Sequence, residues 1–254
     1  MRDFCPILAA LLLTAPLASA AHLTPQTSAA FDRYIELTEA QRKADLAANR
    51  FLRLNQVGSG QLHVESAATL DQGKKIEVPD GMIQHWIGAM FIPGATLQRV
   101  TDILQDYPNY KNFYPPEVIE SKQISHQGDE YDVFLRLYKK RILTVVLNTN
   151  YHVRYATVDP HRATVISRST RIAELKNGTD ELPVGDDTGF LWRLYTYWRF
   201  EQSGGGVHAE CEAISLSRDV PGFLSWMIKG FLEKFPKESM INTLRGTKSA
   251  VLGR

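Results

Sequence analysis

Four charged residues on two neighbouring segments could act together on a ligand. Arg193 and Arg199 precede a glycine-rich turn, and Glu210 and Glu212 follow it. Two adjacent strands joined by that turn would place the arginines beside the glutamates, because paired strands present every second residue on the same face. Two interpretations are open: a solvated outer face of cross-strand ion pairs, or an inward ion pair that orients the polar head of a ligand.

The spaced motifs that mark common catalytic and metal sites do not occur in the chain. It contains no HExxH, no paired CxxC, no nucleophile elbow and no phosphate loop. Its seven histidines lack the spacing of metal ligands. His85 and His152 fall on predicted strands, where structural roles compete with catalytic ones. We therefore predict no metal site and no cofactor, and the catalytic residues, if there are any, stay unassigned.

Composition argues against a nucleic-acid partner. The 254 residues carry a formal net charge of +1, and charges of both signs are interspersed along the chain. A dedicated nucleic-acid binder concentrates positive charge on one face or one segment. The charge distribution therefore favours other classes of ligand.

The first twenty residues have the three regions of a secretory signal peptide. Met1-Arg2-Asp3 is followed by the apolar run Phe4–Leu17 and by the small residues Ala18-Ser19-Ala20. We predict cleavage after residue 20 and a periplasmic or secreted mature protein, the alternative being an uncleaved membrane anchor. Cleavage would leave Cys211 as the remaining cysteine, so the mature chain would have no intramolecular disulfide.

Hydrophobic periodicity and turn residues divide the rest of the chain into elements. Residues 27–54 predict an N-terminal helix, followed by a linker to residue 60. Residues 96–106 predict a second helix, and the aromatic, proline-rich residues 107–116 are too interrupted for regular structure. Strands are predicted over 61–66, 74–78, 82–92, 117–125, 130–138, 142–156, 162–174, 190–202 and 207–217.

The last two strands predict one apolar and one polar face. With the turn centred on Ser203-Gly204, Trp198 faces Ala209 and Thr196 faces Cys211. Phe190, Trp192, Leu194, Trp198 and Phe200 then lie opposite small residues at 209, 211 and 213. These small residues either allow a helix to approach closely or leave space for a ligand.

The C-terminal residues 221–252 carry a broad apolar stripe that must lie on another apolar surface. Pro236 interrupts it, so we expect a helix ending near Phe235 and a second helix over 237–252 that packs across the sheet. Trp226 falls beside Lys229 on the polar side of the first helix. An amphipathic ring there suits a membrane interface, the alternative being packing under another segment.

This order of elements resembles the START-like (SRPBCC) superfamily, which includes polyketide cyclases, coenzyme Q-binding proteins and lipid-transfer proteins, and it resembles secreted bacterial members of that superfamily. The residues that carry the resemblance are PDGMIQHWIGAMFIPGATLQRVTDILQDYPNYKNFYP, FLWRLYTYWRFEQSGGGVHAECEAISLSRDVP and FPKESMINTLRGTK. The resemblance implies an α+β helix-grip fold over residues 61–254, with a curved antiparallel sheet of about seven strands wrapped around a long C-terminal helix. The N-terminal helix is an addition to that fold.

The resemblance also implies an apolar cavity between the sheet and the long helix. The alternating apolar residues of the strand over 142–156 agree with it, although they would equally line a filled core. We expect a carrier of an apolar small molecule or lipid, with transient membrane contact through Trp226 and Lys229. A cyclase or hydrolase acting on an apolar substrate, and a structural domain with a filled core, are the alternatives. The oligomeric state stays open. The expected cavity residues are Leu143, Val145, Leu147, Tyr151, Trp192, Leu194, Trp198, Ala209, Cys211, Ala213, Met227, Phe231, Met240 and Leu244.

Overall fold

The computed structural model describes residues 21–54, 57–58, 60–140, 144–219 and 222–253, with the backbone alone for Ala21 and 222–234. The predicted signal peptide over 1–20 lies outside the described residues. Within them, no helix combines the length and the hydropathy needed to span a bilayer.

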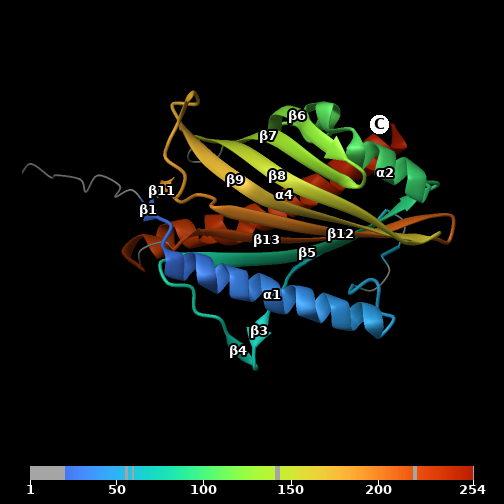
Figure 1. Cartoon of the computed structure of the whole chain (residues 1–254), viewed down its shortest axis with the longest axis horizontal. Helices are drawn as coiled ribbons and strands as arrows, with labels where there is room; N and C mark the ends of the chain where they lie inside the picture. The colour runs from blue at the N-terminus through green and yellow to red at the C-terminus, as the bar shows by residue number, and fades with distance from the viewer. Residues whose placement is uncertain (1–20, 55–56, 59, 141–143, 220–221, 254) are drawn as a thin grey trace, which may run out of the picture.

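One large antiparallel sheet forms the body of the protein (Figure 1). It has nine strands, more than the seven expected, because a strand at one edge and a two-residue strand extend it. The α+β helix-grip prediction is confirmed. In spatial order the strands are β2 (Leu62–Ser66), β5 (Gly81–Pro93), β13 (Gly206–Arg218), β12 (Arg193–Ser203), β9 (Arg162–Lys176), β8 (Thr144–Asp159), β7 (Glu130–Lys140) and β6 (Val118–Gln127), and β10 (Asp180–Glu181) pairs with β9. The remaining short strands pair outside this sheet: β1 (Ala21–His22) with β11 (Asp186–Asp187), and β3 (Leu70–Asp71) with β4 (Lys74–Lys75).

A long C-terminal helix, α4 (Gly222–Leu252), lies along the concave face of this sheet (Figure 1). It continues through Pro236, so the expected break at that residue was wrong. Proline removes one backbone hydrogen bond, and the burial of Met240, Leu244 and Val251 against the sheet holds the helix that follows it. The predicted packing of the segment 237–252 on the sheet is thus present, as the second half of one helix.

The contact between α4 and β5 depends on Gly88. A Cβ atom at this position would lie 2.8 Å from Leu244 Cδ1 and 3.1 Å from Met240 Cγ. Since real Cβ atoms do not approach other carbon atoms so closely, a residue without a side chain is required for α4 to sit this near the strand. Gly88 therefore sets the distance between helix and sheet at this end of the molecule.

The opposite, convex face is covered by the N-terminal helix α1 (Pro25–Ala47), as Figure 1 shows. The Thr24 hydroxyl caps this helix by accepting the Thr27 N–H at 3.1 Å. Phe31 and Ile35 pack from α1 onto sheet residues that include Ile214. The helix ends at Ala47, seven residues before the predicted end at Leu54, because residues 50–54 run in irregular conformation onto the sheet. The polar face predicted for the last two strands is therefore covered by α1.

Short helices fill the segment that was predicted to be irregular. After α2 (Leu97–Gln105), a 3₁₀ turn η1 (Tyr107–Asn109) and one turn of α-helix, α3 (Tyr110–Phe113), lead into β6. The spacing of Tyr107, Tyr110 and Tyr114 suits a helical face. The prolines do not interrupt these helices, because they lie at helix starts or beyond α3.

The β12–β13 hairpin differs from the prediction in its register. Ser203 pairs with Gly206, so Trp198 lies opposite Cys211 and Thr196 opposite Ala213. Gly204 and Gly205 have φ of 60° and 82°, and a two-residue hairpin turn needs positive φ at both central positions. The turn therefore sits one residue later than expected. The partners shift by two residues, which leaves every side chain on its predicted face.

Candidate functional site

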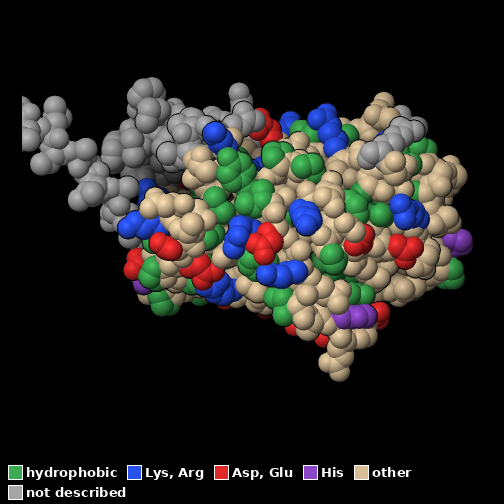
Figure 2. All heavy atoms as spheres, turned by 90° about the horizontal axis from the view of Figure 1, so that it is seen from above, with side chains coloured by type: hydrophobic (Ala, Val, Ile, Leu, Met, Phe, Trp, Pro, Cys, Tyr) green, Lys and Arg blue, Asp and Glu red, His purple; other side chains and the backbone are tan. Residues whose placement is uncertain are grey.

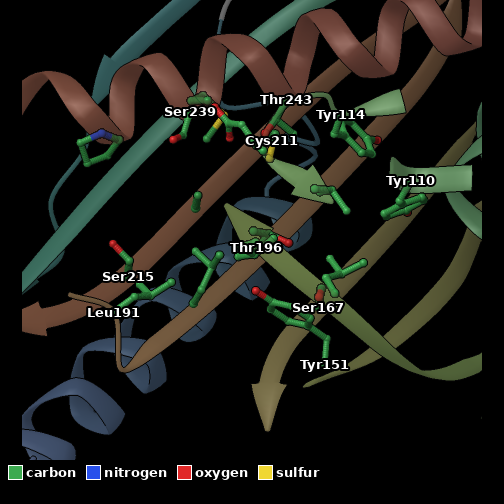
Figure 3. Close-up of a pocket in the computed structure, with 18 of the residues that line it drawn as sticks. Tyr110, Tyr114, Tyr151, Ser167, Leu191, Thr196, Cys211, Ser215, Ser239 and Thr243 are labelled. Atoms are coloured by element: carbon green, nitrogen blue, oxygen red, sulfur yellow. The ribbon is translucent and has the colours of Figure 1, made fainter. Parts of the chain in front are cut away.

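A cavity of about 310 Å³ lies between the concave face of the sheet and α4 (Figure 3). Its walls come from strands β5 to β9, β12 and β13, from α2, η1 and α3, and from α4. Apolar and aromatic side chains form most of the lining. A concave, mostly apolar site with a few polar groups is the usual form of a small-molecule site.

Tyrosines whose hydroxyls are bonded to the protein close one end of this cavity. Tyr155 and Tyr110 both donate to the Leu104 carbonyl, at 2.7 and 2.6 Å, and the Tyr107 and Tyr155 hydroxyls lie 2.7 Å apart. Burial raises the pKa of Tyr110 well above its usual value. These rings are neutral, and their polar atoms are already partnered within the protein.

Two further buried tyrosines line the cavity. Burial raises the pKa of Tyr151 to about 12, against the opposing hydrogen bond with Thr149. It also raises the pKa of Tyr114 to about 12, against the hydrogen bond with Thr247, whose Oγ1 lies 3.0 Å from the hydroxyl. Both side chains therefore present neutral groups to a ligand at ordinary pH.

The other end of the cavity carries an ion pair and two phenylalanines. Lys139 Nζ donates to Glu117 Oε1, which also accepts from Asn242 Nδ2 at 2.8 Å. The same ammonium lies 4.7 Å from the centre of the Phe235 ring, and Phe190 meets that ring edge-on at 5.4 Å. Lys139 is thus paired within the protein.

Small polar side chains interrupt the apolar lining in the middle of the cavity. Ser167 on β9 pairs directly with Thr196 on β12, and Ser215 lies on β13, the next strand. Ser239 and Thr243 project from α4 on the opposite wall, as Figure 3 shows. Polar groups at mid-length thus divide the apolar surface into two halves.

Half of the predicted cavity residues line the cavity, and they come from β8, β12, β13 and α4. They are Leu147, Tyr151, Leu194, Trp198, Cys211, Ala213 and Met240. Leu143 and the side chains of Met227, Phe231, Trp226 and Lys229 lie outside the described residues.

Four predicted cavity residues are buried elsewhere. Trp192 packs on the convex face with Phe31, and its Nε1–H donates to Asp187 Oδ1 at 3.1 Å. The prediction began this strand before Arg193, the first residue of β12. Side chains alternate between the two faces only within the strand, so the pattern does not hold at Trp192. Ala209 and Leu244 are in the packed core beside Gly88, and Val145 packs in a small cluster with Leu147 and Ile172. None of the four lines the cavity.

Several lining residues were missed by the sequence interpretation. Thr196 and Ser215 occupy inward positions of β12 and β13 that the pattern marked as apolar. Hydroxyl residues on the apolar side of two paired strands were the available signal. Tyr107 and Tyr110 were missed because their segment was read as irregular. Glu117, in the loop before β6, and Lys139, near the end of β7, were also missed, and they form an ion pair.

The charged residues considered first lie on the convex face, away from this cavity. Arg199 Nη1 donates to Glu210 Oε1 at 3.1 Å, so the expected cross-strand pair forms, whereas Arg193 donates to the Trp192 carbonyl. Glu210 and Glu212 are 2% and 1% exposed, because α1 and residues 50–54 cover them. They are therefore not a solvated surface, and they do not line this cavity. Over the described ranges, no group of three or more His, Cys, Asp or Glu side chains could hold a metal ion.

Comparison with solved structures finds the same architecture in proteins of low sequence identity. Human STARD10 superposes with a TM-score of 0.51 at 11% identity, over 84% of this chain and 79% of that protein. The chain has a START-like (SRPBCC), helix-grip fold. A STAR-related lipid transfer protein from Xanthomonas axonopodis is also similar, with a TM-score of 0.49 at 15% identity, over 74% of this chain and 98% of that one.

A third similar structure carries a different description. The Zhui aromatase/cyclase from Streptomyces sp. R1128 has a TM-score of 0.46 at 12% identity, over 67% of this chain and 94% of that one. At these identities the likeness shows the fold alone. Comparison with protein-family models and with curated protein sequences finds no significant match.

Proposed function

We propose that this START-like protein is a carrier that binds one neutral, apolar, lipid-like molecule in the cavity between the sheet and α4. The observation that supports it best is the character of the lining. Apolar and aromatic walls surround about 310 Å³ of space, and transfer of apolar surface from water into such a space is favourable.

The charges at the cavity favour a neutral ligand. Among the described residues that line the cavity, Glu117 carries the one carboxylate and Lys139 the one ammonium. These two groups bond to each other. An isolated ionised group moved into an apolar environment carries a large desolvation penalty. A charged ligand would have to break this ion pair or stay unpaired, so neutral molecules are preferred.

The enzymatic alternative, a cyclase or hydrolase acting on an apolar substrate, needs groups that exchange protons near neutral pH. Burial holds the pKa values of Tyr114 and Tyr151 at about 12. It also raises the pKa of the Cys211 thiol well above its usual value, so little thiolate is present. These groups suit hydrogen bonding better than acid–base chemistry, and we favour the carrier.

Two further parts of the proposal rest on sequence. The N-terminal residues 1–20 direct the chain to the periplasm or outside the cell, and the polar side of the 222–235 segment touches a membrane during ligand exchange through Trp226 and Lys229. Liposome flotation of the chain lacking residues 1–20, wild type against Trp226→Ala, measures that contact. Equal flotation of both proteins would exclude Trp226 from it.

The test of the carrier proposal is native mass spectrometry of the protein purified from its own host, followed by displacement of the neutral apolar probe N-phenyl-1-naphthylamine. We expect one copurified apolar molecule per chain and saturable probe binding. Conversion of that molecule into a product would favour the enzyme. An absence of both bound mass and probe binding would contradict the carrier.

A matched pair of variants assigns the binding to the cavity. Ala213 lines it, so Ala213→Trp should fill part of the space and weaken probe binding at least tenfold. Ala156 is an exposed residue of β8, and Ala156→Trp should leave the affinity unchanged. Ala209 is packed in the core at 1% exposure, so Ala209→Trp would test the fold and not the site. Equal affinities in a folded Ala213→Trp variant and in wild type would place the probe elsewhere.

A further inference from the structure

A band of hydroxyl groups crosses the middle of the apolar cavity. Ser167 and Thr196 are paired neighbours on β9 and β12, and Ser215 pairs with Leu194, two residues before Thr196 on the same strand. All three residues line the cavity (Figure 3). The hydroxyls therefore form a diagonal across three adjacent strands. Apolar and aromatic side chains line the cavity on both sides of it, and Gln84 and Ser217 add two polar side chains beside Ser215.

Two more hydroxyls face this diagonal from α4. Ser239 and Thr243 are four residues apart and so lie on the same side of the helix, and both line the cavity. Figure 3 shows them on the helix above the sheet residues Thr196 and Ser215. The Ser239 Oγ is buried and makes no hydrogen bond. The helix and the sheet thus contribute hydroxyls to one level of the cavity.

The sheet hydroxyls also lack protein partners. Within the described ranges, no hydrogen bond joins the Ser167, Thr196 or Ser215 side chain to another residue, whereas the tyrosines at the end of the cavity are bonded. These three side chains are half-buried and face the cavity, so their hydroxyls are free to bond a molecule that occupies it. Several such hydroxyls at one level of a mostly apolar cavity would pair with polar atoms of a ligand.

We propose that the ligand carries a neutral oxygen function, such as a ketone, ester or hydroxyl group, in the middle of an otherwise apolar molecule. The apolar halves lie in the two halves of the cavity, and the central oxygen accepts hydrogen bonds from Thr196 and its hydroxyl neighbours. This inference rests on the proposed carrier function and specifies its ligand class. It excludes molecules whose oxygen atoms are confined to one end.

The experiment compares two probes that differ in one central oxygen. A fifteen-carbon symmetrical ketone and the fifteen-carbon alkane compete against N-phenyl-1-naphthylamine on the chain lacking residues 1–20. One hydrogen bond of ordinary strength corresponds to an affinity difference of about three- to tenfold. We expect the ketone to bind tighter than the alkane by about that factor.

Variants locate the source of the preference. Thr196→Val replaces the hydroxyl with a methyl group of similar size, and it should remove the preference for the ketone while leaving the affinity for the alkane unchanged. Ser167→Ala and Ser215→Ala should reduce the preference in part. Thr157 is an exposed threonine of β8, so Thr157→Val should keep the full preference.

Stability provides a readout that needs no ligand. Because Thr196→Val removes an unpartnered polar group, the melting temperature of the free protein should stay the same or rise. A clear fall would mean that the hydroxyl has a structural role, which would overturn the inference.

The outcomes separate this inference from the carrier proposal. If the reporter binds and both competitors displace it equally well, the carrier proposal stands and the central oxygen is wrong. If the ketone preference survives in all three hydroxyl variants, the band is not its source and the inference fails. If the reporter does not bind at all, the carrier proposal fails, and this inference fails with it.

Discussion

Nε2 of His85 lies 2.5 Å from Oε1 of Glu212, in the buried layer between the sheet and α1. The Tyr34 hydroxyl from α1 lies 2.8 Å from His85 Nδ1 and accepts the Thr69 N–H at 2.8 Å. The tautomer that completes this chain of hydrogen bonds carries its proton on Nε2 and donates it to Glu212. Helix, strand and carboxylate are thereby linked through one imidazole.

Glu212 is also the anion for two arginines. Arg42 from α1 forms an ion pair with its Oε2, and Arg53 Nη1 donates to its Oε1 at 2.9 Å. Burial alone would raise the pKa of Glu212, but the hydrogen bond from His85 and the positive charges of Arg42 and Arg53 outweigh it and lower the pKa to about 2. The carboxylate therefore holds the N-terminal segment on the convex face.

Removing the charge of Glu212 should loosen that attachment. Glu212→Gln keeps the shape but leaves Arg42, whose side chain is 11% exposed, without its counter-ion. We expect a loss of about 3–5 kcal/mol in the free energy of unfolding, measured by urea denaturation. Glu77→Gln alters an exposed glutamate and should change stability by less than about 0.5 kcal/mol. Equal stability of the two variants would contradict this account of α1.

The two neighbouring glutamates should respond to pH in opposite directions. Because the folded-state pKa of Glu212 is depressed, its stabilisation is complete above the ordinary value of 4.5 and is lost as pH falls toward about 2. Burial raises the pKa of Glu210, against the hydrogen bonds from the Leu54 and Arg53 amides and the charge of Arg199. The folded chain therefore takes up this proton more readily, and its contribution to stability grows as pH falls.

Urea denaturation between pH 7 and pH 3 tests this difference. The deficit of Glu212→Gln relative to wild type should shrink as pH falls, because the wild-type carboxylate is then being protonated. The deficit of Glu210→Gln should be smaller at pH 7 and should grow as pH falls. Parallel pH profiles for the two variants would show that their environments do not differ as described.

Because α4 lies so close to β5, substitutions of Gly88 and Leu244 should have coupled effects on stability. Gly88→Ala places a Cβ 2.8 Å from Leu244 Cδ1, and overpacking of this kind destabilises by about 1–3 kcal/mol. Leu244 is 0% exposed, so Leu244→Ala alone should cost about 2–5 kcal/mol. In the double variant the shortened side chain makes room for the new methyl group. Its loss should fall short of the sum by about 1 kcal/mol or more, in a cycle of urea denaturation curves. Strict additivity would show that the two positions do not touch.

Most of the fold could be predicted because strands and helices each produce a periodic pattern of apolar residues in the sequence. The period-two alternation around Trp198 and Cys211 located the hairpin and its two faces. The register could not be read with the same certainty, because Gly204, Gly205 and Gly206 allow more than one turn. A shift of two residues preserves the faces, so the error changed partners without changing which side chains point inward.

The wrong predictions have two physical causes, which are contacts between distant segments and the exact end of a strand. Nothing in the alternation of β13 reveals that Glu210 is covered, since its partners at Arg53 and Leu54 lie more than 150 positions earlier in the chain. Trp192 was misplaced because β12 begins one residue after it. The continuity of α4 through Pro236 likewise depends on packing, which outweighs a local preference.

Cys211 offers a direct report on access to the cavity. It lines the cavity, is 2% exposed, and is the one cysteine of residues 21–254. Since burial raises the pKa of its thiol well above the usual value, the reactive thiolate is scarce at neutral pH. We expect methyl methanethiosulfonate to modify Cys211 at least tenfold more slowly in the folded chain than in urea, and saturating N-phenyl-1-naphthylamine to slow it further.

In a control with Cys211→Ser and Ser249→Cys, the thiol occupies an exposed position of α4. It should react rapidly whether or not the probe is present. The same Cys211 rate with and without the probe would mean that the probe binds outside the cavity.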